Sequence, residues 1–203
     1  MSSIGILAYG SLIGHPGKEI EPLIRERRLK VKTPFCIEFA RKSKKRSDAP
    51  TVIPVESGGC SVLATILVLD AGISLEKAED LLWRRETGNE CSDRHYNQPA
   101  QSNNNPNKMV VEKLRNFEGI GLVLYTKLGA NITDISPSKL ADLAIASVKA
   151  EAEAGKTGED GISYLISLKQ QGILTPMMPD YENEILKKTG TSSLEKALNM
   201  LSG

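Results

Sequence analysis

The chain has 203 residues, 40% of them hydrophobic and 25% charged, with a formal net charge of +1. This length and composition suit one good-sized globular domain, and folding would bury roughly 70% of the surface of the unfolded chain. The near-neutral charge gives no signal for nucleic-acid or membrane binding, and no apolar run approaches the length of a bilayer span. The first residues, Met-Ser-Ser-Ile-Gly-Ile, lack the basic region of a signal peptide. We therefore expect a cytoplasmic protein.

The cysteines and histidines are few and widely spaced. Cys36, Cys60 and Cys91 are odd in number and form no C-x-x-C pair, and His15 and His95 have no metal-ligand spacing. We expect three reduced thiols, no disulfide framework and no metal site.

The first half of the chain has the character of β-strands. Residues 4–9 form a short apolar run that ends at Gly10, which predicts a buried strand entering a tight turn. Further strands are predicted near residues 28–39, 50–56 and 60–69, where β-branched and apolar residues recur.

One helix and one more strand are predicted in the middle of the chain. Ser74 is a suitable N-cap for a helix over residues 75–86, and Gly88 is a suitable stop. Residues 97–108 are polar, rich in Asn and contain two prolines, which predicts a mobile surface loop. Residues 119–126 are predicted to form a strand.

The remainder is predicted to be helical from about residue 136. Ser136 precedes a proline and begins a helix over residues 137–153, and a second helix is expected over 159–171. Ser192 and Glu195 fit a capping box for a last short helix. The pattern as a whole predicts an α+β fold.

The helix over residues 75–86 carries an unusual carboxylate. Leu75, Ala78 and Leu82 form one apolar stripe, and Glu86 follows Leu82 by four residues on the same stripe. A carboxylate at the edge of the core can both accept and donate a proton near neutrality. The alternative interpretation is a helix-end glutamate paired with an arginine. Glu79 lies beside the stripe and is a further candidate.

A second candidate feature is Tyr9-Gly10-Ser11-Leu12, directly after the first strand. A glycine in such a turn lets the backbone approach a ligand, and successive N–H groups can bind an anion. The loop lacks the lysine and further glycines of a phosphate-binding loop, so a nucleotide is not indicated. Taken alone, these four residues are a weak signal for a binding site, and the alternative interpretation is a plain tight turn.

Three short motifs together resemble the gamma-glutamylcyclotransferase-like superfamily, in particular its ChaC-like branch. Residues 6–12 (Ile-Leu-Ala-Tyr-Gly-Ser-Leu) resemble its N-terminal loop, and residues 82–86 (Leu-Trp-Arg-Arg-Glu) resemble a segment whose Glu is catalytic. Residues 158–165 (Gly-Glu-Asp-Gly-Ile-Ser-Tyr-Leu) resemble its late Tyr-Leu element. The order and approximate spacing agree over most of the chain.

The resemblance implies a single domain over residues 1–203, built on a small mixed β-barrel with flanking helices. It implies an enzyme that releases 5-oxoproline from a gamma-glutamyl peptide, amino acid or amine, without metal or organic cofactor. The catalytic residue would be Glu86. The substrate-binding residues would be Tyr9, Gly10, Ser11, Leu12 and Tyr164.

Two other functions remain open at this stage. The same fold can serve as a non-catalytic module that binds a ligand or a protein. The basic segment 41–46 could contact phosphates, although the near-neutral net charge argues against a nucleic-acid binder. A solvated loop, or a contact with substrate carboxylates, explains the basic segment as well. Cys60 is expected to be a small core residue. The oligomeric state is not indicated.

Overall fold

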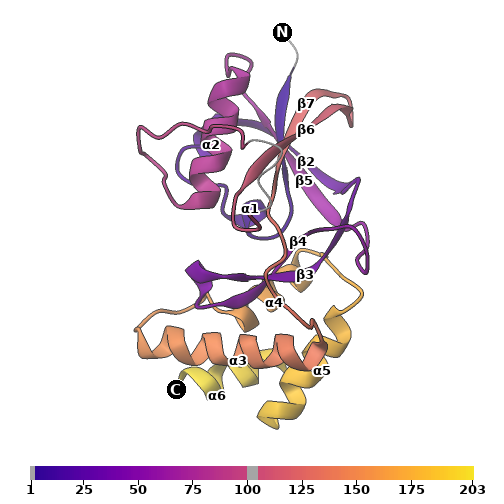
Figure 1. Ribbon diagram of the computed structural model, residues 1–203, viewed down its shortest axis with the longest axis vertical. Helices are drawn as coiled ribbons and strands as arrows, with labels where there is room; N and C mark the ends of the chain where they lie inside the picture. Colours follow the sequence, from indigo (N-terminus) through magenta and orange to yellow (C-terminus); the bar gives the residue numbers. More distant parts are fainter. Residues whose placement is uncertain (1–2, 100–104) are drawn as a thin grey trace. The chain divides into compact units, whose positions relative to one another are not determined.

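A computed structural model describes residues 3–99 and 105–203 (Figure 1). The chain forms two compact units, each assembled from separate stretches of sequence. The first contains the residues up to Thr33 and Leu63–Gly129, and the second contains Pro34–Val62 and Ala130–Gly203. Both strands and helices are present, which confirms the predicted α+β class.

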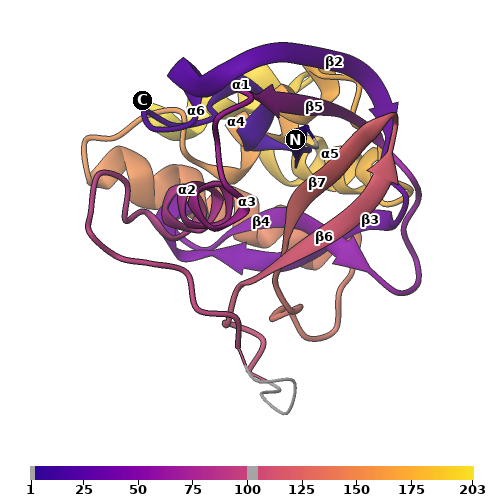
Figure 2. The same cartoon turned by 90° about the horizontal axis from the view of Figure 1, so that it is seen from above.

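The first unit is built on a mixed five-stranded sheet with the order β2-β5-β1-β7-β6. Its strands are β1 (Ile4–Ala8), β2 (Ile24–Lys32), β5 (Leu63–Leu69), β6 (Val110–Phe117) and β7 (Ile120–Lys127). β1 and β7 are parallel, and the other neighbours are antiparallel. Figure 2 shows β2 beside β5 and the hairpin of β6 and β7. Among the described strands no closed barrel is found, so the expected small mixed β-barrel is not confirmed.

Helix α2 (Leu75–Thr87) packs on this sheet against β1, β6 and β7. The Ser74 hydroxyl accepts a hydrogen bond from the N–H of Lys77 at 3.2 Å, and Gly88 ends the helix with a left-handed backbone (φ 72°), as predicted. The apolar side of α2 faces the strands, because packing against the sheet removes this apolar stripe from water. The buried core side chains of this unit include Ile6, Ala8, Leu12, Ile20, Leu67, Leu69, Ala78, Leu81, Leu82, Val111 and Leu124.

The second unit combines an antiparallel hairpin with four helices. The hairpin consists of β3 (Cys36–Ser43) and β4 (Ala49–Val55). The helices are α3 (Pro137–Glu153), α4 (Gly161–Gln170), α5 (Met178–Thr189) and α6 (Leu194–Ser202). α3 packs against α4, α5, α6 and β4 (Figure 1). Over the described residues, no helix combines the length and hydropathy needed to cross a bilayer.

A buried carboxylate ties α5 to the hairpin in the second unit. Glu38 on β3 is 4% exposed, and it accepts hydrogen bonds from the Thr175 hydroxyl at 2.6 Å and the Met177 N–H at 3.0 Å. The amides that precede a helix have no acceptor within it, so Glu38 acts as a cap supplied from a distant strand. The rings of Phe39 and Tyr181 meet edge to face, with centroids 5.1 Å apart.

The strand predicted over residues 28–39 is wrong in its extent. Two strands, β2 and β3, occupy this stretch and belong to different sheets. Pro34 lies between them, and proline cannot donate a ladder hydrogen bond. The basic segment is also not one loop, because β3 runs to Ser43 and a 3-10 turn (Lys44–Arg46) follows.

The strand β6 (Val110–Phe117) and the helix α5 (Met178–Thr189) were absent from the sequence prediction. β6 is an edge strand that carries several charged residues, and these obscure the apolar pattern by which a strand is predicted. α5 is preceded by Pro176 and contains Pro179 in its first turn. The two prolines make the segment look like a loop in the sequence, although proline is tolerated at a helix start. The last helix is capped by Ser193, whose hydroxyl accepts from the N–H of Lys196, so the predicted capping box begins one residue too early.

The remaining boundaries shift by a few residues. β5 begins at Leu63, and Cys60 instead forms a single bridge with Ile37 and is half-buried. In the segment 97–108, residues 97–99 and 105–108 have no helix or strand, and residues 100–104 lie outside the described residues. The mobility expected for this segment stays a prediction.

Candidate functional site

The four loop residues singled out in the sequence follow β1 and turn into the short helix α1 (Ser11–Gly14). The Tyr9 hydroxyl donates to the carbonyl oxygen of Thr126 on β7 at 2.8 Å. Gly10 has φ 78° and ψ −141°, a conformation open essentially to glycine alone. Leu12 packs into the core. The loop is thereby anchored on both sides of its glycine.

Glu86 lies in the last turn of α2, with 21% of its side chain exposed. Its Oε1 forms an ion pair with the Nη1 group of the preceding residue, Arg85, whose side chain is 13% exposed. The carboxylate is therefore half-buried and held by a cation. This contact agrees with both interpretations of the sequence, an acid–base group and a helix-end glutamate paired with an arginine.

Arg85 connects Glu86 with the loop that follows β1. Its Nε and Nη2 groups donate to the carbonyl oxygen of His15 at 3.1 and 2.6 Å, and Nη2 also donates to the Ser11 hydroxyl at 3.3 Å. Two of the predicted site residues, Ser11 and Glu86, thus contact one guanidinium although 75 positions separate them in the sequence. Arg85 was not among the predicted site residues, and its place within the Arg-Arg-Glu motif is the sequence signal that points to it.

The segment after α1 lies tightly against the end of α2. A Cβ added at Gly17 (φ 96°) would collide with the Glu90 side chain and stand 2.8 Å from Cγ of Arg85. The N–H of Lys18 donates to Oε1 of Glu90 at 2.7 Å. Only glycine permits this approach, so Gly17 helps to bring the His15 carbonyl within reach of Arg85.

A buried ion pair lies on the neighbouring side of α2. Arg84, 3% exposed, donates to both carboxylate oxygens of Glu19, at 3.0 and 2.8 Å. The hydrogen bonds from Arg84 hold the pKa of Glu19 below its usual range, although burial raises it. The same pairing raises the pKa of Arg84. Glu19 lies outside the motifs that the sequence suggested, whereas Arg84 lies within the motif over residues 82–86.

Asp80 extends this network toward the loop after α2. It accepts from the Tyr96 N–H and contacts Nδ1 of His95, each at 2.7 Å. Burial raises the pKa of Asp80, but the Tyr96 N–H, His95 and Arg84 outweigh it, so the pKa lies below its usual range. Asp80 thus fastens the returning chain to the helix. The His95 side chain is 74% exposed.

The other carboxylate candidate, Glu79, is engaged elsewhere. Its Oε1 forms an ion pair with Nζ of Lys113 on β6 at 2.7 Å, and 13% of its side chain is exposed. Glu79 therefore holds α2 to the edge hairpin, which is a structural role.

Tyr164 lies in the second unit, on α4, and is 7% exposed. The guanidinium of Arg46 stands 4.9 Å from the centre of its ring, a cation–π contact. Gly161, the fourth residue of the same motif, lets α4 approach α3, because an added Cβ would stand 2.9 Å from Cα of Ala144. In this unit the motif over residues 158–165 has an evident packing role.

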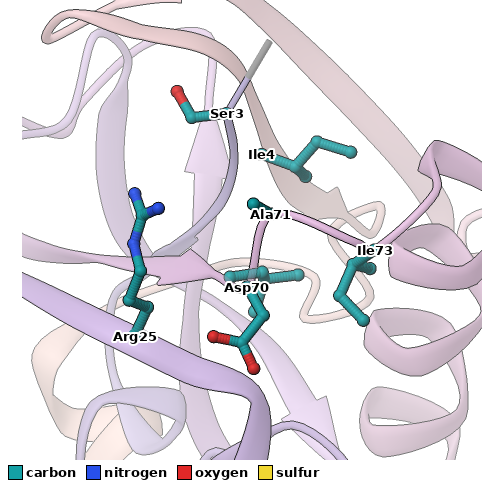
Figure 3. A pocket seen from close by; sticks show the side chains of 7 residues that line it. Ser3, Ile4, Arg25, Asp70, Ala71 and Ile73 are labelled. Carbon is teal, nitrogen blue, oxygen red and sulfur yellow. The ribbon is translucent and has the colours of Figure 1, made fainter. Parts of the chain in front are cut away.

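A small pocket is found at the other end of α2 (Figure 3). It measures about 70 Å³ and is lined by Ser3, Ile4, Arg25, Leu69, Asp70, Ala71 and Ile73. Figure 3 shows Arg25 and Asp70 as its charged groups. Ligand pockets usually enclose roughly 300–1,000 Å³, so this one suits at most a few atoms.

Within residues 3–99 and 105–203, no group of three or more His, Cys, Asp and Glu side chains could hold a metal ion. The cysteines Cys36, Cys60 and Cys91 are free thiols. Burial raises the pKa of Cys60, and its Sγ donates to the Leu174 carbonyl at 3.3 Å. Compared with protein-family models and with curated proteins, the chain matches none.

Proposed function

We propose that this protein is a gamma-glutamylcyclotransferase-type enzyme that releases 5-oxoproline from a gamma-glutamyl peptide, amino acid or amine. One observation carries the proposal. Arg85 contacts both Glu86 and Ser11, so two of the three motifs on which the resemblance depends meet within the first unit. The small barrel, the single domain and the cytoplasmic location that were expected from the sequence belong to this proposal.

The proposed reaction is an intramolecular aminolysis. The free α-amine of the gamma-glutamyl group attacks its own side-chain carbonyl carbon, a C–N bond forms in a five-membered lactam, and the original amide C–N bond breaks. The attacking amine loses one proton and the leaving nitrogen gains one. A single carboxylate can carry that proton from one nitrogen to the other, and Glu86 is assigned this role.

The loop after β1 is assigned the glutamyl end of the substrate. Ser11 and Leu12 are the first residues of α1, and amides at the start of a helix have no acceptor inside it. Amides held in this way can bind a carboxylate or a developing negative charge. Tyr9 and Gly10 hold the loop in its conformation. For Tyr164, a role in substrate binding is proposed on the family resemblance alone.

The test is release of 5-oxoproline by the purified protein. Glutathione, gamma-glutamyl amino acids and gamma-glutamyl amines should be supplied separately, with the product quantified by chromatography. We expect release from at least one class. Absence of product from all three, with binding retained in calorimetry, would instead indicate the non-catalytic module.

A further inference from the structure

We infer that Arg85 is a positioning residue that holds the Glu86 carboxylate in register with the loop over residues 11–15. The inference rests on the proposed function and adds a residue to it. The contacts of Arg85 are with Glu86, Ser11 and the carbonyl oxygen of His15. Arg85 acts through Glu86 and through the backbone of the loop.

The contact between Arg85 and Glu86 is not one that a helix makes by itself. Side chains at successive helical positions diverge by about 100° and do not face each other. The guanidinium reaches Glu86 while it is also held by two groups outside the helix, the carbonyl oxygen of His15 and the hydroxyl of Ser11. The loop therefore fixes the direction in which the guanidinium points.

The geometry requires an arginine. The planar guanidinium presents donors on three nitrogens, and all three nitrogens of Arg85 are used. Nε donates to the His15 carbonyl, Nη1 contacts Glu86, and Nη2 donates to both the His15 carbonyl and the Ser11 hydroxyl. A lysine carries its donors on one nitrogen and cannot reach acceptors on opposite sides of a fork. The positive charge of a lysine at this position would leave the orientation of the Glu86 carboxylate unfixed.

The neighbouring arginine provides a natural contrast. Arg84 points to another side of α2, where Glu19 binds it in a two-pronged ion pair. Its contacts involve Glu19, Asp80 and the Arg94 carbonyl, and none of these residues belongs to the predicted site. Arg84 is a stability residue, and Arg85 is the residue through which the site is aligned.

The experiment compares Arg85→Lys, Arg85→Ala and Arg84→Lys in the full chain. For both Arg85 variants we expect kcat to fall about 10²-fold, since misplacement of a catalytic group by about 1 Å costs this much. KM should change less than threefold, and the melting temperature should stay close to that of the wild type. Arg84→Lys should show the reverse pattern, with a lower melting temperature and a near-normal kcat in the folded protein.

Chemical rescue separates alignment from a general packing defect. Millimolar guanidinium chloride, far below denaturing concentrations, should restore part of the kcat of Arg85→Ala, whereas ammonium chloride at equal ionic strength should not. A structural role alone would give no such difference between the two cations.

The outcomes distinguish the two claims. A wild type without cyclotransferase activity overturns the proposed function and this inference with it. An active wild type whose Arg85 variants keep their kcat overturns only the inference. The same holds if the Arg85 variants lose melting temperature in step with activity and guanidinium does not restore turnover.

Discussion

Arg84 and Glu19 form a two-pronged ion pair in which Nε and Nη2 each donate to a different carboxylate oxygen, at 3.0 and 2.8 Å. The side chains are 4% and 17% exposed, so the pair is largely removed from water. This pair joins α2 to the chain that follows α1, which is the same chain that Arg85 contacts. The stability of the candidate site therefore depends on it.

Glu19→Gln should destabilise the protein by about 2–4 kcal/mol, because it leaves the buried Arg84 guanidinium without its main counter-charge. Urea denaturation gives the free energy of unfolding. Glu21→Gln is the matched control, since Glu21 pairs with Arg27 at 2.8 Å on the surface, where both side chains are at least one-third exposed. Its effect should stay below about 1 kcal/mol. Equal losses in the two variants would contradict a special role for the buried pair.

Acid should weaken the protein through the same network. Glu19 and Asp80 both have pKa values below their usual range in the folded protein. Their contribution to stability is therefore complete above the unfolded values of about 4, and it is lost as the pH falls through the lower folded values. Denaturation followed from pH 6 to about pH 2.5 should show this decline. A decline just as steep in the Glu19→Gln, Asp80→Asn double variant would show that other carboxylates cause it.

Glu86→Gln should lower 5-oxoproline release by about 10²–10⁴-fold, because the amide cannot shuttle a proton. The melting temperature should change little, since the Arg85 guanidinium keeps its hydrogen bonds to the His15 carbonyl and the Ser11 hydroxyl. Glu79→Gln serves as the comparison, as Glu79 is bound to Lys113 and lies in the same helix. Near-normal turnover by a folded Glu86→Gln protein would remove Glu86 from the mechanism.

Gly10→Ala should cost about 1–3 kcal/mol and reduce activity, because the backbone of Gly10 (φ 78°, ψ −141°) is closed to alanine. Gly14→Ala is the control four residues on. A Cβ there meets no atom within 4 Å, and alanine favours the helix, so Gly14→Ala should be neutral or slightly stabilising. Thermal unfolding and 5-oxoproline release measured on the same preparations test both variants.

Glu38→Gln should destabilise the second unit by about 1–3 kcal/mol. An amide cannot accept from both the Thr175 hydroxyl and the Met177 N–H, which bind different oxygens of the carboxylate. Glu184→Gln, which disturbs only a weak surface pair with Lys187 at 3.4 Å, is the comparison. If denaturation cannot distinguish the two variants, Glu38 does not hold α5 to the hairpin.

Local signals predicted the elements whose ends carry strong chemical markers. Ser74 and Gly88 bracket α2, and Ser136 begins α3, because their side chain or backbone supplies what a helix terminus lacks. Prediction failed for β6 and α5, where charged residues or prolines obscure elements that are held by partners far away in the sequence. Pro34 marks the break between β2 and β3 in the sequence, because proline cannot donate a ladder hydrogen bond.

The sequence by itself determined the α+β class, the turn at Gly10 and the inward-facing stripe that carries Glu86. These follow from local backbone preference and from the helical period, which act over a few residues. Only the tertiary structure decided which arginine of the Arg84-Arg85 pair meets Glu19 and which meets Glu86. Both are good helix residues with the same side chain, and the difference arises from the chain over residues 15–19, which Gly17 allows to lie against α2. Contacts over such a distance in sequence depend on packing, which no local pattern encodes.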